Sequence, residues 1–218
     1  MPIPKSSKRE YDSSRRQAQA NETRRHILEA ARKLFIERGY VGTTAEAIAA
    51  EASVSLQTIY AIFKNKRKIL ISLMNVSSSD GSEDRLPMSE RVGAKAVAEE
   101  RDQHHQLQMF AEVVAYNLDQ VAIISKILID AAKTETEIDR ILQRLNKQRL
   151  ENMSLAVQQI AVNGPFRENI SREDAINTVW TLTSPEVFLL LTQDRGWSKE
   201  KYAEWLADML IRALLPVS

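Results

Sequence analysis

Apolar side chains recur at helical spacing along most of this 218-residue chain, without a convincing run of alternating polar and apolar β-branched residues. The first such segment runs from about Asn21 to Arg38 and is followed by Gly39, a residue type that often ends helices. A long segment over 135–162 keeps the same rhythm and stops at Asn163-Gly164-Pro165. The pattern therefore predicts an all-α fold.

Small polar residues mark the expected helix starts. Thr43, with Glu46 three residues later, has the spacing of a capping box, and Ser55 precedes a helix that reaches Phe63. Asn65 has the same position before a fourth helix. The remaining expected starts are Ser171 (with Asp174), Ser184 before Pro185, and Ser198, and further helices are expected over 91–103, 106–118 and 120–133.

Three short helices fall within residues 21–63, and only Ser53-Val54-Ser55 separates the second from the third. This is helix-turn-helix spacing. On a helical wheel one side of the third helix carries Leu56, Ile59, Ile62 and Phe63. The opposite side carries Gln57, Thr58, Ala61 and Lys64, with Tyr60 at the edge. Gln, Thr and Ala can all contact base edges in a major groove, whereas the alternative is a surface helix whose polar side is only solvated.

Charge is divided unevenly along the chain. Residues 1–68 contain 14 Lys and Arg against 7 Asp and Glu, whereas residues 69–218 contain 16 against 22. The expected first turns of the helices at Asn65 and Asn21 also hold cations, which oppose the helix dipole: Lys66, Arg67, Lys68, Arg24 and Arg25. We infer that a phosphate backbone neutralises them, so that the N-terminal part meets a polyanion.

Several functional classes are not supported. The chain has no cysteine, and its apolar stretches are far shorter than the ~20 residues of a membrane span. No apolar segment follows the basic N-terminus, so a cytoplasmic protein is expected. The stretch Glu99–His105 holds metal-like side chains, but the remaining histidine, His26, lies in the helix-turn-helix. With no phosphate-cradling loop or nucleophile elbow, we expect no enzyme activity, cofactor or metal.

The stretch TTAEAIAAEASVSLQTIYAIFKNKRKIL (residues 43–70) closely resembles the DNA-binding signature of the tetracycline-repressor (TetR) family. The matching elements are Thr43-Thr44, Ile48-Ala49, Val54-Ser55, Thr58-Ile59-Tyr60, Phe63 and Asn65-Lys66. The C-terminal stretch SPEVFLLLTQDRGWSKEKYAEWLADMLIRALL also looks like that of family members. Ser53 and Ala61 depart from the pattern, since a turn glycine and a larger side chain are usual there.

The resemblance implies roles for particular residues. Thr44, Tyr60 and Lys66 would contact phosphates, and Leu56, Gln57, Thr58 and Ala61 would face bases; Ser55 and Lys64 complete the expected DNA-binding set. Residues 69–218 would form a ligand pocket and a dimer interface. The candidate pocket residues are Met74, Met109, Phe110, Tyr116 and Met153. The candidate interface residues are Trp180, Trp205, Leu206, Met209 and Leu210, and ordinary core packing is the alternative for every one of these.

These observations predict three segments. Residues 1–20 would be a flexible basic arm with Lys5, Lys8, Arg9, Arg15 and Arg16, either a minor-groove contact or a disordered tail. Residues 21–68 would bind double-stranded DNA, and residues 69–218 would bind a ligand and dimerise. The expected function is a homodimeric regulator, a repressor that a small, largely apolar ligand releases from a palindromic operator. The alternative is a helical protein-interaction module that has lost DNA binding.

Overall fold

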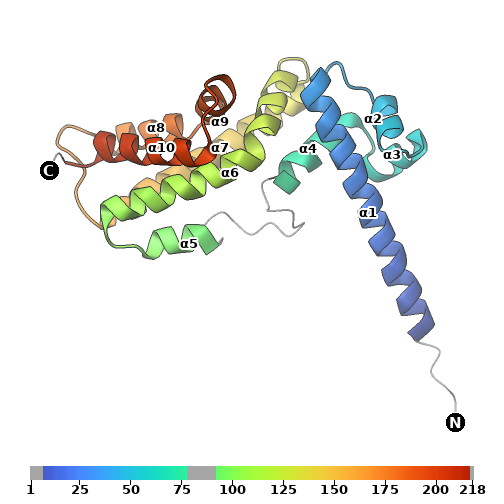
Figure 1. Cartoon of the computed structure of the whole chain (residues 1–218), viewed down its shortest axis with the longest axis horizontal. Coiled ribbons are helices and arrows are strands. Elements are labelled where there is room, and N and C mark those ends of the chain that lie inside the picture. The colour runs from blue at the N-terminus through green and yellow to red at the C-terminus, as the bar shows by residue number, and fades with distance from the viewer. Residues whose placement is uncertain (1–6, 78–91, 217–218) are drawn as a thin grey trace, which may run out of the picture. The chain divides into compact units, whose positions relative to one another are not determined.

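The computed structural model describes residues 7–77 and 92–216, and these residues form helices and connecting turns without strands (Figure 1). The all-α prediction is confirmed. The helices are α1 Ser7–Arg38, α2 Ala45–Glu51, α3 Leu56–Phe63, α4 Lys66–Ser77, α5 Val92–Glu99, α6 Gln103–Ala132, α7 Thr136–Val162, α8 Arg172–Leu182, α9 Pro185–Leu189, the π-helix η2 Leu190–Asp194, and α10 Lys199–Leu214.

The chain divides into two compact units, which meet in sequence between Leu73 and Met74. This point lies inside α4, a few residues beyond the boundary predicted after residue 68. The N-terminal unit contains α1 to α3 and most of α4, and the C-terminal unit contains α5 to α10.

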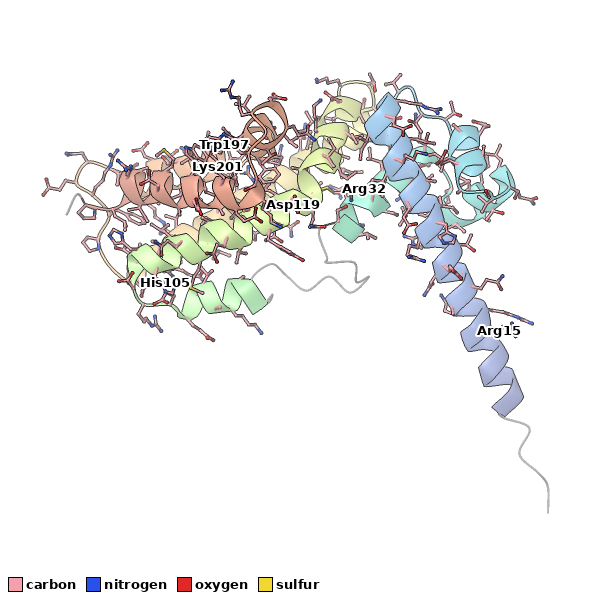
Figure 2. The ribbon with its side chains drawn as sticks, viewed as in Figure 1. Arg15, Arg32, His105, Asp119, Trp197 and Lys201 are labelled. Atoms are coloured by element: carbon pink, nitrogen blue, oxygen red, sulfur yellow. The ribbon has the colours of Figure 1, made fainter. Side chains whose placement is uncertain are left out.

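Helix α1 begins at Ser7, so the predicted helix start at about Asn21 is wrong, and residues 7–20 are helical. Between Ser7 and Arg38 the sequence has no glycine or proline, and each residue added to an existing helix gains a hydrogen bond. Residues 7–20 are mostly polar, but polar residues retain helical propensity. Arg15 is exposed and extends away from α1 (Figure 2). Lys5 and the side chains of Lys8 and Arg9 lie outside the described residues.

The start of α2 also differs from the prediction. Thr44, not Thr43, is the N-cap, and its hydroxyl accepts a hydrogen bond from the backbone N–H of Ala47 at 3.1 Å. Thr43 is fully buried, and its hydroxyl donates toward the carbonyls of Gly39 and Leu34 at 2.8 and 3.1 Å. The shift by one residue removes the expected capping box, because the third helical residue is no longer Glu46.

The predicted caps of the other helices are confirmed. Ser55, Ser184 and Ser198 each accept a hydrogen bond from the backbone N–H three residues later. Ser171 and Asp174 form a complete capping box at α8. These starts were predictable because serine is a favoured N-cap residue and each of these serines precedes a segment with apolar residues at helical spacing.

One long helix, α6, replaces the two helices expected over 106–118 and 120–133. The predicted break at residue 119 does not occur, because Asp119 does not interrupt backbone hydrogen bonding and lies on the exposed side of the helix. Helix α10 runs along α6 (Figure 1), and α7 and α9 also pack against it. Tyr202 of α10 is fully buried, and its hydroxyl donates to the carbonyl of Leu182 at 2.9 Å.

Candidate nucleic-acid interface and ligand cavity

The turn between α2 and α3 has helix-turn-helix geometry. Backbone hydrogen bonds from Ser53 to Ala50 at 3.2 Å and from Val54 to Ala49 at 2.9 Å close it. Ser53 has a φ of 54°, in the left-handed region that favours glycine. The departure from the usual turn glycine therefore places a residue with a β-carbon at this backbone angle.

Helix α3 has the two faces that its sequence predicts. Ser55 caps it, and its hydroxyl lies 2.8 Å from that of Thr58. Ile59 and Phe63 are buried in the N-terminal unit. The side chains on the other side are exposed: Gln57, Tyr60, Ala61 and Lys64. Leu56 and Thr58 are partly buried, so they lie at the border between the faces.

Lys66 stabilises the N-terminal unit through internal hydrogen bonds, a role that the sequence analysis did not predict. Its ammonium group donates to the carbonyls of Tyr40 at 2.7 Å and Thr43 at 2.8 Å, and it lies 4.1 Å from the centre of the Tyr40 ring. These contacts fix the connection between α1 and α2. The exposed lysines on either side, Lys64 and Lys68, have no such internal role.

The predicted position of the cations in a first helical turn is confirmed for α4 but is wrong for α1. Lys66, Arg67 and Lys68 occupy the first turn of α4, where there is no acidic residue. Arg24 and Arg25, however, lie in the middle of α1, because this helix begins at Ser7. The guanidinium of Arg24 lies 4.6 Å from the centre of the Phe63 ring and donates to Ser72 at 3.2 Å. Arg25 pairs with Glu29 at 3.5 Å. The inference of a phosphate site at the start of α1 is therefore wrong.

A further ion pair links α1 to α2. The Lys33 ammonium lies 2.6 Å from the Glu51 carboxylate, and this hydrogen bond raises the pKa of Lys33. Both side chains are substantially exposed, so the pair contributes little to stability. It lies at the end of α2 that leads into the turn before α3.

A cavity of about 450 Å³ lies in the C-terminal unit, with walls from α6, α7 and neighbouring helices. Three of the predicted pocket residues line it: Met74, Phe110 and Met153. Met109 and Tyr116 do not, and this part of the prediction is wrong. At about 100° per residue both lie roughly a third of a turn around α6 from Phe110. Tyr116 is 47% exposed, with the Lys199 ammonium 5.6 Å from its ring centre.

The cavity also contains a polar cluster that the sequence reasoning missed. Arg149 donates from Nη2 to the carbonyl of Trp180 and to the hydroxyl of Thr183, the latter at 3.0 Å. Its guanidinium lies 4.7 Å from the centre of the Trp180 ring. Burial lowers the pKa of Arg149. The available signal was its position in α7, four residues from both Leu145 and Met153 on the apolar stripe.

The predicted dimer residues fall into two groups. Leu206 and Leu210 are fully buried within one chain, so the prediction that they form an interface is wrong. Both face the core because α10 packs along α6. Trp180 lines the cavity. Trp205 and Met209 are partly buried, and Trp205 packs against the rings of Tyr202 and Trp197 at centroid distances of 5.8 and 6.1 Å.

The described residues contain neither a metal-binding cluster nor a membrane-spanning helix. Across residues 7–77 and 92–216, no group of three or more histidine or acidic side chains could hold a metal ion. In the same ranges, no helix has both the length and the hydropathy to cross a membrane. His105, which Figure 2 labels on α6, instead lies 2.6 Å from the Glu100 carboxylate. Hydrogen bonds from the backbone N–H groups of Asp102 and Arg101, followed by this contact with His105, lower the pKa of Glu100.

The N-terminal geometry defines a helix-turn-helix unit, and the C-terminal helices form a separate unit with a cavity. Residues 27–73 match the family model for bacterial regulatory proteins of the tetR family. This match confirms the recognition of the family's DNA-binding signature in the N-terminal unit.

Named relatives agree with this assignment. The chain is 41% identical over 58 residues to the uncharacterized HTH-type transcriptional regulator YvkB of Bacillus subtilis (strain 168). That match covers 27% of this chain and 31% of YvkB, so the chain matches about a third of this curated relative.

Solved structures of similar fold cover both units. NalD of Pseudomonas aeruginosa, the secondary repressor of the MexAB-OprM multidrug efflux pump, is 24% identical with a TM-score of 0.63 over 89% of this chain and 97% of NalD. The regulator FadR of Bacillus subtilis, in complex with stearoyl-CoA, is 19% identical with a TM-score of 0.64 over 86% of this chain and 97% of FadR. At these identities the likeness shows the fold.

Proposed function

We propose that the protein is a transcription regulator that binds double-stranded DNA through α3. The observation that carries this proposal is the pairing of buried Ile59 and Phe63 with exposed Gln57 and Ala61 on one short helix of a tetR-family unit. A glutamine side chain can bond an adenine edge with two hydrogen bonds, and an alanine methyl can contact a thymine methyl. Lys64 and Lys68 are exposed at the ends of α3 and α4, where they can contact phosphates.

We propose that the working form is a homodimer. A single short recognition helix reads only a few base pairs, and two-fold symmetry lets two such helices read half-sites about 34–36 Å apart. The partly exposed Trp205 and Met209 stay candidates for the interface, but Leu206 and Leu210 do not.

A small, largely apolar ligand is proposed to control DNA binding. The cavity in the C-terminal unit supports this, since its volume of about 450 Å³ lies within the usual range for small-molecule sites. The similar fold of FadR in complex with stearoyl-CoA, and the description of NalD as a repressor, favour ligand-released repression. Such a ligand must bind more tightly to a dimer whose recognition helices are wrongly spaced for DNA. The protein would act by binding rather than catalysis, as the regulatory family suggests.

Selection of bound sequences from random duplex DNA tests the proposal. We expect a palindrome with half-sites centred about 10 base pairs apart, or a multiple of this spacing. Enrichment of a single asymmetric site would contradict the homodimer, and no enrichment would contradict DNA recognition itself.

A substitution links the selected site to α3. Gln57→Ala should relax the preference at one base pair of each half-site, at a cost of about 1–3 kcal/mol for the preferred base. The measurement is competition binding with operators that differ at one position. An unchanged preference at every position would show that Gln57 does not read DNA.

A further inference from the structure

In the wall of the C-terminal cavity, the side chain of Trp180 has a buried donor without a hydrogen-bond partner. The indole Nε1–H of Trp180 is inaccessible to solvent and has no hydrogen-bond partner. Among the described residues, no other buried side-chain nitrogen or oxygen atom lacks a partner. Buried donors are almost always paired, so an orphan donor beside a cavity needs an explanation. Trp180 lines the cavity, and its ring lies under the guanidinium of Arg149.

Arg149 also has N–H donors that make no hydrogen bond. A guanidinium has five N–H donors, and the hydrogen bonds of Arg149 all come from Nη2. Its Nη1 and Nε atoms are not sealed, since they are absent from the buried unpaired atoms. No carboxylate in the described part of the chain lies within salt-bridge distance of Arg149. The charge of Glu186 acts on the guanidinium from a longer distance, so the cluster holds a partly buried positive charge without a direct ion-pair partner.

The rest of the cavity wall is mostly apolar. Val114, Leu118, Leu142 and Leu145 contribute side chains to it, together with Phe110 and Met153. Among the lining residues Arg149 is the cationic side chain and Glu186 is the acidic one. Glu186 is exposed and keeps its hydration, whereas Arg149 is partly buried, so a bound anion gains more at Arg149 than a bound cation gains at Glu186.

We propose that this cavity binds an amphiphile with a carboxylate head and an apolar chain, and that Arg149 recognises the head. The inference rests on the proposed ligand-responsive function and names the ligand class of that site. A carboxylate matches the planar N–H fork of Arg149 and supplies the missing anion, while the aliphatic and aromatic wall holds the chain.

The test compares three ligands that share one chain length. Decanoate, decanol and decylammonium are titrated into the full-length protein by isothermal calorimetry at neutral pH. We expect decanoate to bind at least about tenfold more tightly than decanol, because an ionised carboxylate can pair with the guanidinium through two hydrogen bonds, whereas a hydroxyl accepts one from it. Decylammonium should bind most weakly.

Variants then assign the preference to Arg149. Arg149→Met should abolish the difference between decanoate and decanol, and Arg149→Lys should retain part of it. The matched control is Arg144→Met, because Arg144 lies on the same helix, is exposed and does not line the cavity. Glu186→Gln, at an exposed position, should tighten decanoate binding about twofold and leave decanol unchanged; this variant tests the charge argument if Arg149→Met does not fold.

Three results would overturn the inference: equal binding of decanoate and decanol, tighter binding of decylammonium, or no binding of any of the three. A preference for decanoate that survives Arg149→Met would also overturn it. DNA binding by the ligand-free protein is measured in parallel. Its absence would overturn the proposed function, whereas normal DNA binding with any of the results above would overturn the ligand class alone.

Discussion

Two residues beside α3 adopt left-handed backbone angles without being glycine. Ser53, in the turn before the helix, has a φ of 54°, and Lys64, at its end, has a φ of 64°. For residues with a β-carbon this conformation costs roughly 1–2 kcal/mol. The helix proposed to read DNA is therefore held between two strained positions, and its fixed orientation depends on the packing of Ile59 and Phe63.

Replacing Ser53 with glycine should stabilise the N-terminal unit. Ser53→Gly removes the steric cost of the left-handed angle but adds flexibility to the unfolded chain, so we expect a net gain of about 0.5–1 kcal/mol in the free energy of unfolding. Urea denaturation measures it. The matched control is Ala52→Gly, at a neighbouring residue with a φ of −79°, which should lose stability. A loss of stability in Ser53→Gly would contradict the strain.

Substitution of Lys66 should lower stability, whereas substitution of Lys64 should weaken DNA binding without lowering stability. Lys66→Met leaves the carbonyls of Tyr40 and Thr43 without their donor and should lower the free energy of unfolding by about 1–3 kcal/mol. Lys64→Met should leave the melting temperature unchanged and weaken binding to all duplex sequences alike. Calorimetry and binding titrations on both variants test this. Equal effects of the two variants on stability would refute the distinct role of Lys66.

At the scale of helices, the sequence predicted helix starts and buried faces best where a capping residue precedes apolar residues at helical spacing. Ser55 and the apolar positions up to Phe63 fixed both the start and the buried face of α3. Prediction failed where polarity was interpreted as a break. Residues 7–20 are mostly polar, and a break was predicted at Asp119 of α6, but helices continue through both. Side-chain polarity decides which face is buried, while only glycine, proline or a competing cap stops the backbone.

The continuity of α6 has a measurable consequence. Gln120→Gly should lower the free energy of unfolding by about 1 kcal/mol relative to Gln120→Ala, because glycine is costly inside a helix. If residue 120 were in a connection between two helices, the two variants would have similar stability. Chemical denaturation of both variants distinguishes these cases.

At the scale of the whole chain, sequence predicted two functional parts but not which surface of the C-terminal unit meets another copy. Tryptophan and leucine on α10 serve core packing and interfaces equally well, and only the packing of α10 along α6 shows that Leu206 and Leu210 belong to the core. The sequence predicted an apolar cavity in this unit, and the predicted residues Phe110 and Met153 do line one. Its polar cluster was not, because the partners of Arg149 lie 31 and 34 residues away in the sequence.

The central claim is that the exposed side of α3 faces duplex DNA, and the salt dependence of DNA binding tests it most directly. Fluorescence anisotropy of the selected operator should show an affinity that falls by roughly a hundredfold or more between about 50 and 200 mM salt. Ala61→Glu, which places a negative charge on that side, should abolish binding without loss of stability. Val162→Glu, at an exposed position of the C-terminal unit, should have no effect. Wild-type protein that ignores duplex DNA at low salt, or Ala61→Glu protein that binds normally, would contradict the claim.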